Sequence, residues 1–206
     1  MATPAERTAA ILRETGALLT GRHIVYTSGR HGSAYVNKDA IYPHTERVAE
    51  LCRFLADLAR GARADIVCGP AMGGIILAQW TGHHLGLPAV YAEKAAGGGM
   101  ALRRGYDGLV RGRRVLVVED IVNTGGSLRD AIAAVRTAGG EVVMAAALCN
   151  RGGVRAADVD APALSALIDL PLESWPEESC PLCRQGVAVD TDVGKGREFL
   201  ARRAAS

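Results

Sequence analysis

The chain has 206 residues, a length at which one compact domain can bury a sizeable core. Its hydrophobic (49%) and charged (22%) fractions are ordinary for a globular protein, and its net charge of +2 comes with scattered basic residues. We therefore expect no nucleic-acid-binding surface, and no apolar run reaches the roughly 18 residues of a membrane span. The N-terminus lacks the apolar stretch of a signal peptide, so we expect a cytoplasmic protein that binds neither nucleic acid nor membrane.

The N-terminal region predicts a small unit that precedes the main fold. Apolar residues at helical spacing predict a helix over residues 4–19, and two short apolar runs predict strands at 22–26 and 34–37 that form a hairpin. We expect residues from roughly 1–40, together with the C-terminal segment, to form a small hood over a functional site.

The rest of the chain alternates between strands and helices. Helical periodicity is found over residues 45–61, 74–85 and 127–138, and apolar runs predict strands at 66–68, 89–91, 115–118, 142–148 and 164–168. Strands that are apolar throughout and separated by helices are typical of an α/β fold, with a mostly parallel sheet and helices on both faces. Because no repeat or low-complexity linker divides the chain, we expect residues 1–206 to form one domain.

The segment 115–128 is the most informative part of the sequence. A buried strand ends at the carboxylates Glu119 and Asp120, and the turn 124–127 (Thr-Gly-Gly-Ser) then opens a helix. Ligands of open α/β sheets bind beyond the carboxyl ends of strands, and a glycine-rich turn at a helix N-terminus offers N–H groups to phosphate. The pattern therefore favours a phosphorylated sugar as ligand. The alternative is an ordinary strand-to-helix connection with Ser127 as the N-cap.

Two well-known nucleotide motifs do not fit this segment. G-x-G-x-x-G is absent from the turn, and no lysine follows its glycines as a P-loop requires.

A second glycine-bearing turn, residues 69–74, also follows a strand and opens a helix. Two such turns at neighbouring strand ends can hold two phosphate groups of one ligand. Taken alone, Gly73 and Gly74 are more typical of close packing at the start of a helix than of anion binding.

A long connection lies between Tyr91 and Val115. Its three consecutive glycines, 97–99, disfavour stable helix or strand, and Lys94 and the pair Arg103-Arg104 flank them. This pattern predicts a mobile lid over the site. A solvated hairpin with ordinary surface charges is the alternative.

Five cysteines, an odd number, suit a reducing compartment. Cys52, Cys68 and Cys149 belong to apolar segments and are expected to be buried. Cys180 and Cys183 form a C-x₂-C pair, which is half of a zinc site. Because the sequence shows no second half, a surface thiol pair or a subunit-packing turn is the favoured interpretation.

The segment 119–127 resembles the phosphoribosyl diphosphate (PRPP) signature of the type I phosphoribosyltransferases. In that family the acidic pair holds the ribose hydroxyls, the turn wraps the 5′-phosphate, and the loop matching 71–73 contacts pyrophosphate. The resemblance implies the following PRPP-binding residues: Glu119, Asp120, Ile121, Val122, Asn123, Thr124, Gly125, Gly126, Ser127, Ala71, Met72, Gly73, Lys94, Arg103 and Arg104.

Most of the chain is similar to the orotate phosphoribosyltransferases. The similarity covers residues 16–19, the turn 28–31 with Tyr35, residues 150–153 and the tail 175–183. It implies transfer of ribose 5-phosphate from PRPP to orotate, giving orotidine 5′-phosphate and pyrophosphate in UMP biosynthesis. It also implies Mg²⁺ held mainly by PRPP, with no protein ligand assigned, and a homodimer whose lids act across the subunits.

The resemblance also implies roles at the reacting centre. Arg151 is expected to bind the carboxylate of orotate, since guanidinium and carboxylate pair bidentately, and Asn123 and Arg30 to contact the base. Lys94, Asp120 and Glu119 are the expected catalytic residues, acting by electrostatics and positioning rather than as nucleophiles.

The sequence departs from the orotate family at three places. Glu93 precedes Lys94, and alanine and glycine follow it, where the family has further basic residues. Asn123 replaces a threonine, and Thr27 stands where many members have a base-binding lysine, whose charge Arg30 is placed to supply. Transfer to another base and a non-catalytic regulator that senses PRPP therefore remain alternatives.

Overall fold

A computed structural model describes residues 2–204, and its centre is a six-stranded sheet with the order β5-β4-β3-β6-β7-β8. Five strands run parallel: β3 (Ile66–Pro70), β4 (Ala89–Lys94), β6 (Arg114–Val122), β7 (Glu141–Asn150) and β8 (Leu164–Asp169). The short β5 (Met100–Ala101) pairs antiparallel with β4. The predicted strands are therefore confirmed, each somewhat longer than its apolar run.

Helices cover both faces of this sheet. On one face lie α1 (Pro4–Glu14), α2 (Thr45–Ala59) and α3 (Gly73–Leu85), and on the other lie α4 (Tyr106–Val110) and α5 (Gly126–Thr137). Alternate residues of β6 point to opposite faces: Leu116 packs in the first layer and Val117 in the second. Since both faces are buried, residues 115–118 of β6 are all apolar, as the sequence predicted.

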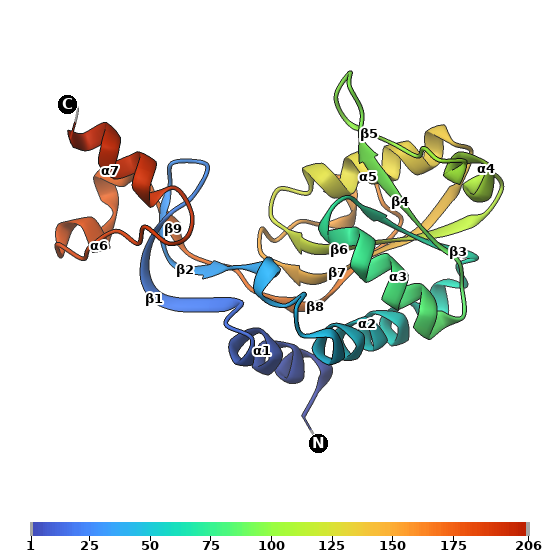
Figure 1. Cartoon of the computed structure of the whole chain (residues 1–206), viewed down its shortest axis with the longest axis horizontal. Helices are drawn as coiled ribbons and strands as arrows, with labels where there is room; N and C mark the ends of the chain where they lie inside the picture. Colours follow the sequence, from blue (N-terminus) through green and yellow to red (C-terminus); the bar gives the residue numbers. More distant parts are fainter. Residues whose placement is uncertain (1, 205–206) are drawn as a thin grey trace.

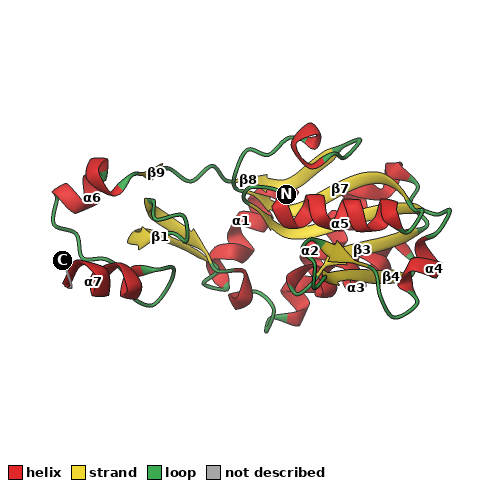
Figure 2. Ribbon diagram, turned by 90° about the horizontal axis from the view of Figure 1, so that it is seen from above, coloured by secondary structure: helices red, strands yellow, loops and turns green. Residues whose placement is uncertain are grey.

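A smaller unit lies to one side of the main sheet (Figures 1 and 2). It consists of β1 (Leu18–Val25), β2 (His31–Val36) and β9 (Ser174–Trp175), with the helices α6 (Pro181–Arg184) and α7 (Gly196–Ala204). We call these elements the terminal unit, because they combine residues 18–36, near the N-terminus, with residues 174–204 of the C-terminal segment. The predicted hairpin is confirmed as β1 and β2.

The first helix is shorter than predicted. Helix α1 begins with a capping box between Thr3 and Glu6, and ends at Glu14, before Gly16 with a φ of 70°. Leu18 and Leu19, which fitted the helical spacing, belong to β1 instead. The prediction of a helix to residue 19 is wrong because a left-handed glycine ends the helix and redirects the chain. Helix α1 packs in the core of the main sheet through Ile11 and Leu12.

The segment predicted as an irregular lid is a hairpin in the structure. Strand β4 continues to Lys94, which pairs with Met100, and Gly98 and Gly99 take positive φ in the connecting turn. The backbone is that of a hairpin, and the role of this segment as a lid stays a prediction. Glycines that disfavour a regular strand are well suited to the turn between two strands.

Four 3₁₀ helices complete the described chain: Lys38–Ala40, Arg60–Ala62, Ala156–Val159 and Glu177–Ser179. Among the helices of residues 2–204, none has both the length and the apolar character to cross a membrane.

The start of helix α3 lies against the end of β3 without intervening side chains. A Cβ atom added to Gly69 would overlap the backbone of Gly74, and a Cβ on Gly74 would lie 2.6 Å from Cδ of Pro70. The packing interpretation of this turn is therefore correct for Gly74.

Replacing Gly69 with alanine should lower the free energy of unfolding by about 1–3 kcal/mol, the cost of overpacking a tight contact. Gly108→Ala is the matched control, because its Cβ would meet no atom within 4 Å. Urea denaturation of both variants measures the effect, and equal stabilities would contradict the close contact.

Candidate functional site

The carboxyl ends of β3, β6 and β7 meet the chain that follows β2 around a cleft of about 300 Å³. The residues that line the cleft are Tyr35, Val36, Asn37, Lys38, Asp39, Pro70, Ala71, Met72, Gly73, Glu119, Asp120, Ile121, Asn123, Ser127 and Arg151. Both glycine-bearing turns contribute to this set. The structure thus brings together the two turns that the sequence placed at neighbouring strand ends.

Two adjacent carboxylates form the wall of the cleft at the end of β6. Glu119 is only 6% exposed and Asp120 only 3%. Backbone N–H groups donate to both: that of Asp120 to Oε1 of Glu119 (3.1 Å), and that of Ile121 to Oδ1 of Asp120 (2.6 Å). Burial and the neighbouring Asp120 carboxylate raise the pKa of Glu119 well above its ordinary range.

Lys38 and Tyr42 hold the second oxygen of Asp120. Nζ of Lys38 lies 3.0 Å from Oδ2, and the Tyr42 hydroxyl donates to the same atom at 2.8 Å. Burial opposes the charge of Lys38, but the Asp120 carboxylate outweighs it and raises the pKa of the lysine. The sequence analysis missed both residues. The scarcity of lysine, three in the whole chain, was the available signal for Lys38.

The loop 71–73 lies directly opposite this carboxylate. Ala71, Met72 and Gly73 all line the cleft, and Met72 is 80% exposed. A Cβ on Gly73 would overlap the carboxylate of Asp120, so only glycine allows this approach. Helix α3 begins here, and the N–H groups of its first turn have no partners within the helix. Gly73 therefore serves the site, whereas Gly74 serves packing.

The turn after β6 forms a second cavity at the N-terminus of α5, adjoining the cleft. It is lined by Glu119, Ile121, Val122, Asn123, Thr124, Gly125, Gly126, Ser127 and Leu128. Gly125, with a φ of 77°, is the N-cap of α5, and no side chain caps the helix. The alternative interpretation of Ser127 as the N-cap is therefore wrong. Its exposed hydroxyl is left to face the cavity.

A cavity of about 590 Å³ lies beside the cleft and shares Arg151 and Asn123 with it. Nη1 of Arg151 donates to Oδ1 of Asn123 at 3.2 Å, and its Cζ lies 4.2 Å from the centre of the Tyr26 ring. Thr27 and Lys195 line the same cavity. We call it the base cavity, since the resemblance to the orotate family predicts a base beside Arg151. The sequence analysis missed Tyr26 and Lys195, which belong to the terminal unit or its connections.

Four of the expected site residues do not line these cavities in the described chain. The guanidinium of Arg30 donates to Oγ and O of Ser174, at 2.9 and 2.5 Å. Lys94 lies on the β4–β5 hairpin, and Arg103 and Arg104 follow it. Glu93, the departure noted in the sequence, lies 3.2 Å from the guanidinium of Arg104 and 3.9 Å from that of Arg103.

Known proteins resemble this chain in sequence and in structure. The phosphoribosyl transferase domain family matches residues 37–178. The orotate phosphoribosyltransferase of Pelotomaculum thermopropionicum is 41% identical over 178 residues, which are 86% of this chain and 91% of the relative.

Two crystal structures of orotate phosphoribosyltransferases resemble this chain. The enzyme of Aeropyrum pernix has a TM-score of 0.66 and 26% identity, over 79% of this chain and 93% of its own. The Mycobacterium tuberculosis enzyme in complex with PRPP has a TM-score of 0.63 and 27% identity, over 81% and 96% of the two chains. The fold predicted from the sequence is thereby confirmed. The chain belongs to the phosphoribosyltransferase family, and the relative from Pelotomaculum thermopropionicum is an orotate phosphoribosyltransferase.

Proposed function

We propose that this chain is an orotate phosphoribosyltransferase, which transfers ribose 5-phosphate from PRPP to orotate and releases pyrophosphate. The observation that carries the proposal is the single cleft in which an acidic pair, two helix N-termini and Arg151 meet. The curated relatives bear this name, at about 40% identity over most of the chain.

PRPP would be held by its charged ends and its ribose hydroxyls. The cavity at the N-terminus of α5 suits the 5′-phosphate, because the helix dipole and the N–H groups of the turn favour an anion. The loop 71–73 at the start of α3 suits the pyrophosphate group by the same reasoning. Glu119 and Asp120 lie between the two and would accept hydrogen bonds from the ribose hydroxyls.

Orotate would occupy the base cavity next to the ribose. Its carboxylate would pair with Arg151, which stacks on Tyr26 and is oriented by Asn123. Thr27 leaves this cavity without the lysine found in many relatives. Lys195 lines the same cavity, with its Nζ 2.7 Å from Glu198, and would supply the missing positive charge by turning from that partner to the base.

The chemistry needs stabilisation of charge rather than a nucleophilic side chain. Breaking the bond between C1 and pyrophosphate leaves negative charge on the leaving group and positive charge on the ribose ring. Mg²⁺ bound through PRPP would neutralise part of the pyrophosphate charge. The protein fits such an ion only in part, because Lys38 and Tyr42 already hold one oxygen of Asp120. The buried carboxylates would stabilise the ribose cation.

Lys94 would act on the leaving group from a second subunit. In this chain it lies outside the cleft, on an extended hairpin flanked by arginines. A homodimer that exchanges these hairpins would bring the ammonium group to the pyrophosphate and exclude water. We propose such a dimer, working in the cytoplasm.

Mixing the protein with PRPP, Mg²⁺ and one candidate base at a time tests the proposed reaction. Pyrophosphate should be released with orotate and not with uracil or adenine, which lack the carboxylate. Release of pyrophosphate with another base, and not with orotate, would show that this other base is the substrate. Binding of PRPP without release of pyrophosphate for any base would favour the non-catalytic regulator.

Arg151→Ala should raise the KM for orotate by roughly 10- to 100-fold, the cost of losing a hydrogen-bonded charge. The KM for PRPP should change little. Arg155→Ala is the matched control, because Arg155 pairs only locally with Asp158 and is largely exposed. Steady-state kinetics of both variants make the comparison, and equal increases in the two KM values would reject recognition of the carboxylate.

Lys94→Ala should slow turnover by roughly 10²- to 10³-fold, and Asp120→Asn should also slow it severely. In mixed dimers of the two variants, one site combines an intact hairpin with an intact cleft. Random exchange should then restore about a quarter of wild-type turnover. Turnover that stays at the level of the single variants, after subunit exchange has been verified with a tag, would contradict the shared site.

A further inference from the structure

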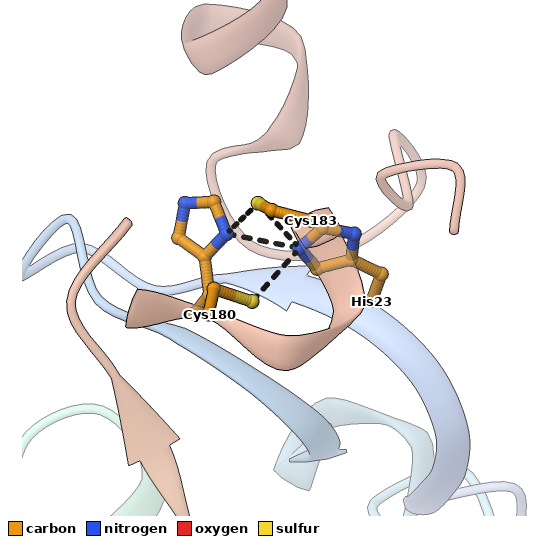
Figure 3. Close-up of side chains that lie close together, drawn as sticks. His23, Cys180 and Cys183 are labelled. Carbon is orange, nitrogen blue, oxygen red and sulfur yellow. Dashed lines mark hydrogen bonds between the residues drawn. The ribbon is translucent and has the colours of Figure 1, made fainter. Parts of the chain in front are cut away.

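Four side chains in the terminal unit converge on one point outside the cleft (Figure 3). His23 comes from β1 and His31 from β2. Cys180 is the N-cap of α6, and Cys183 is the third residue of that helix. Their ligand atoms, two ring nitrogens and two sulfurs, all lie within 4.8 Å of one another.

The environment of the C-x₂-C pair differs from the one predicted. Cys180 is fully buried and Cys183 partly buried, so the expectation of a surface thiol pair is wrong. The second half of a metal site, which the sequence did not reveal, is supplied by two histidines roughly 150 residues earlier in the chain.

We propose that these four residues bind one structural zinc ion. Two thiolates and two imidazoles are a donor set that zinc prefers, in tetrahedral geometry. With ordinary zinc bond lengths, a tetrahedral site has edges of about 3.3 Å between two nitrogens and about 3.6 Å between nitrogen and sulfur.

Four of the six separations between ligand atoms lie within about 0.4 Å of those edges, and the other two do not exceed 4.8 Å. Nε2 of His23 lies 3.6 Å from Sγ of Cys180 and 3.6 Å from Sγ of Cys183. Nδ1 of His31 lies 3.3 Å from Sγ of Cys183 and 2.9 Å from Nε2 of His23. An ion would need only a small separation of the two rings to be held at the centre.

The hydrogen bonding of His23 fixes which of its nitrogens faces the cluster as a ligand. Nδ1 lies 2.7 Å from the carbonyl oxygen of Val187, which can only accept, so Nδ1 carries the proton. Nε2 is therefore the nitrogen that faces the two sulfurs and His31 and is placed to act as the ligand. An outer carbonyl that orients a histidine in this way is typical of zinc sites.

The terminal unit has a small hydrophobic core, so a bound ion would stabilise it. Its buried side chains, such as Ile24 and Phe199, belong to neither of the two hydrophobic clusters that stabilise the main sheet. Units with so little core are commonly held by a metal or a disulfide. A zinc ion would fasten the segment around α6 to the β1–β2 hairpin, and all four coordination positions would come from protein, which leaves none for substrate.

Metal analysis of the untagged protein, purified under reducing conditions, tests the proposal. We expect inductively coupled plasma mass spectrometry to find about one zinc ion per chain. Cobalt substitution should give the intense visible bands of tetrahedral cobalt together with thiolate charge-transfer absorption. Absence of zinc, or a Cys180–Cys183 disulfide in its place, would overturn the assignment.

Cys180→Ser and Cys183→Ser should lose the zinc, whereas Cys52→Ala and His44→Ala, which change a thiol and an imidazole elsewhere, should keep it. If the serine variants do not fold, the wild-type protein still decides the matter. A zinc chelator should lower its melting temperature by roughly 5 °C or more without any change in Mg²⁺. Zinc that persists in a folded Cys183→Ser variant, or a melting temperature indifferent to chelation, would contradict the site.

Discussion

The cleft depends on a concentration of negative charge that the fold buries at the end of one central strand. Two adjacent carboxylates, each less than a tenth exposed, are costly unless charge or protons compensate them. Lys38 and Tyr42 compensate Asp120, and the raised pKa of Glu119 keeps a proton on that carboxyl more readily. In the free protein, the stability that depends on a protonated Glu119 is fully present below the ordinary pKa of a glutamate. It is lost as the pH rises through the raised pKa of Glu119. A ligand that brings hydroxyls and a cation to this wall offsets the same cost.

The two glycine-bearing turns complete the cleft by bringing backbone close to the buried carboxylates. Gly73 places the start of α3 against Asp120, where any side chain would overlap the carboxylate. Gly125 allows the turn that leads into α5, where a Cβ would lie 2.5 Å from Val159. Both helices therefore direct their N-termini at the cleft. An anionic ligand then meets N–H groups at its two ends and carboxylates only in the middle, where hydroxyls suit them.

Sequence reasoning succeeded where the site is local in the chain. The strand, the acidic pair and the turn of residues 115–128 are contiguous, so their chemistry could be read from one segment. It failed where partners are distant: Lys38 and Tyr42 reach Asp120 across about 80 residues. The helix to residue 19 failed differently, because periodicity cannot distinguish a continued helix from a strand that begins with two leucines after a left-handed glycine.

The cluster of two histidines and two cysteines is connected to the cleft by strand β2. Strand β2 carries His31 and, a few residues later, Tyr35, from which the cleft wall continues to Lys38. The base cavity is bounded by Tyr26 between the two strands and by Lys195 just before α7. The β1–β2–β9 sheet and the hydrogen bond that the Lys195 N–H donates to the carbonyl oxygen of Val25 hold these parts in place. A metal ion at the proposed site would therefore limit the movement of the wall that faces the base, while leaving the residues that hold PRPP to the main sheet.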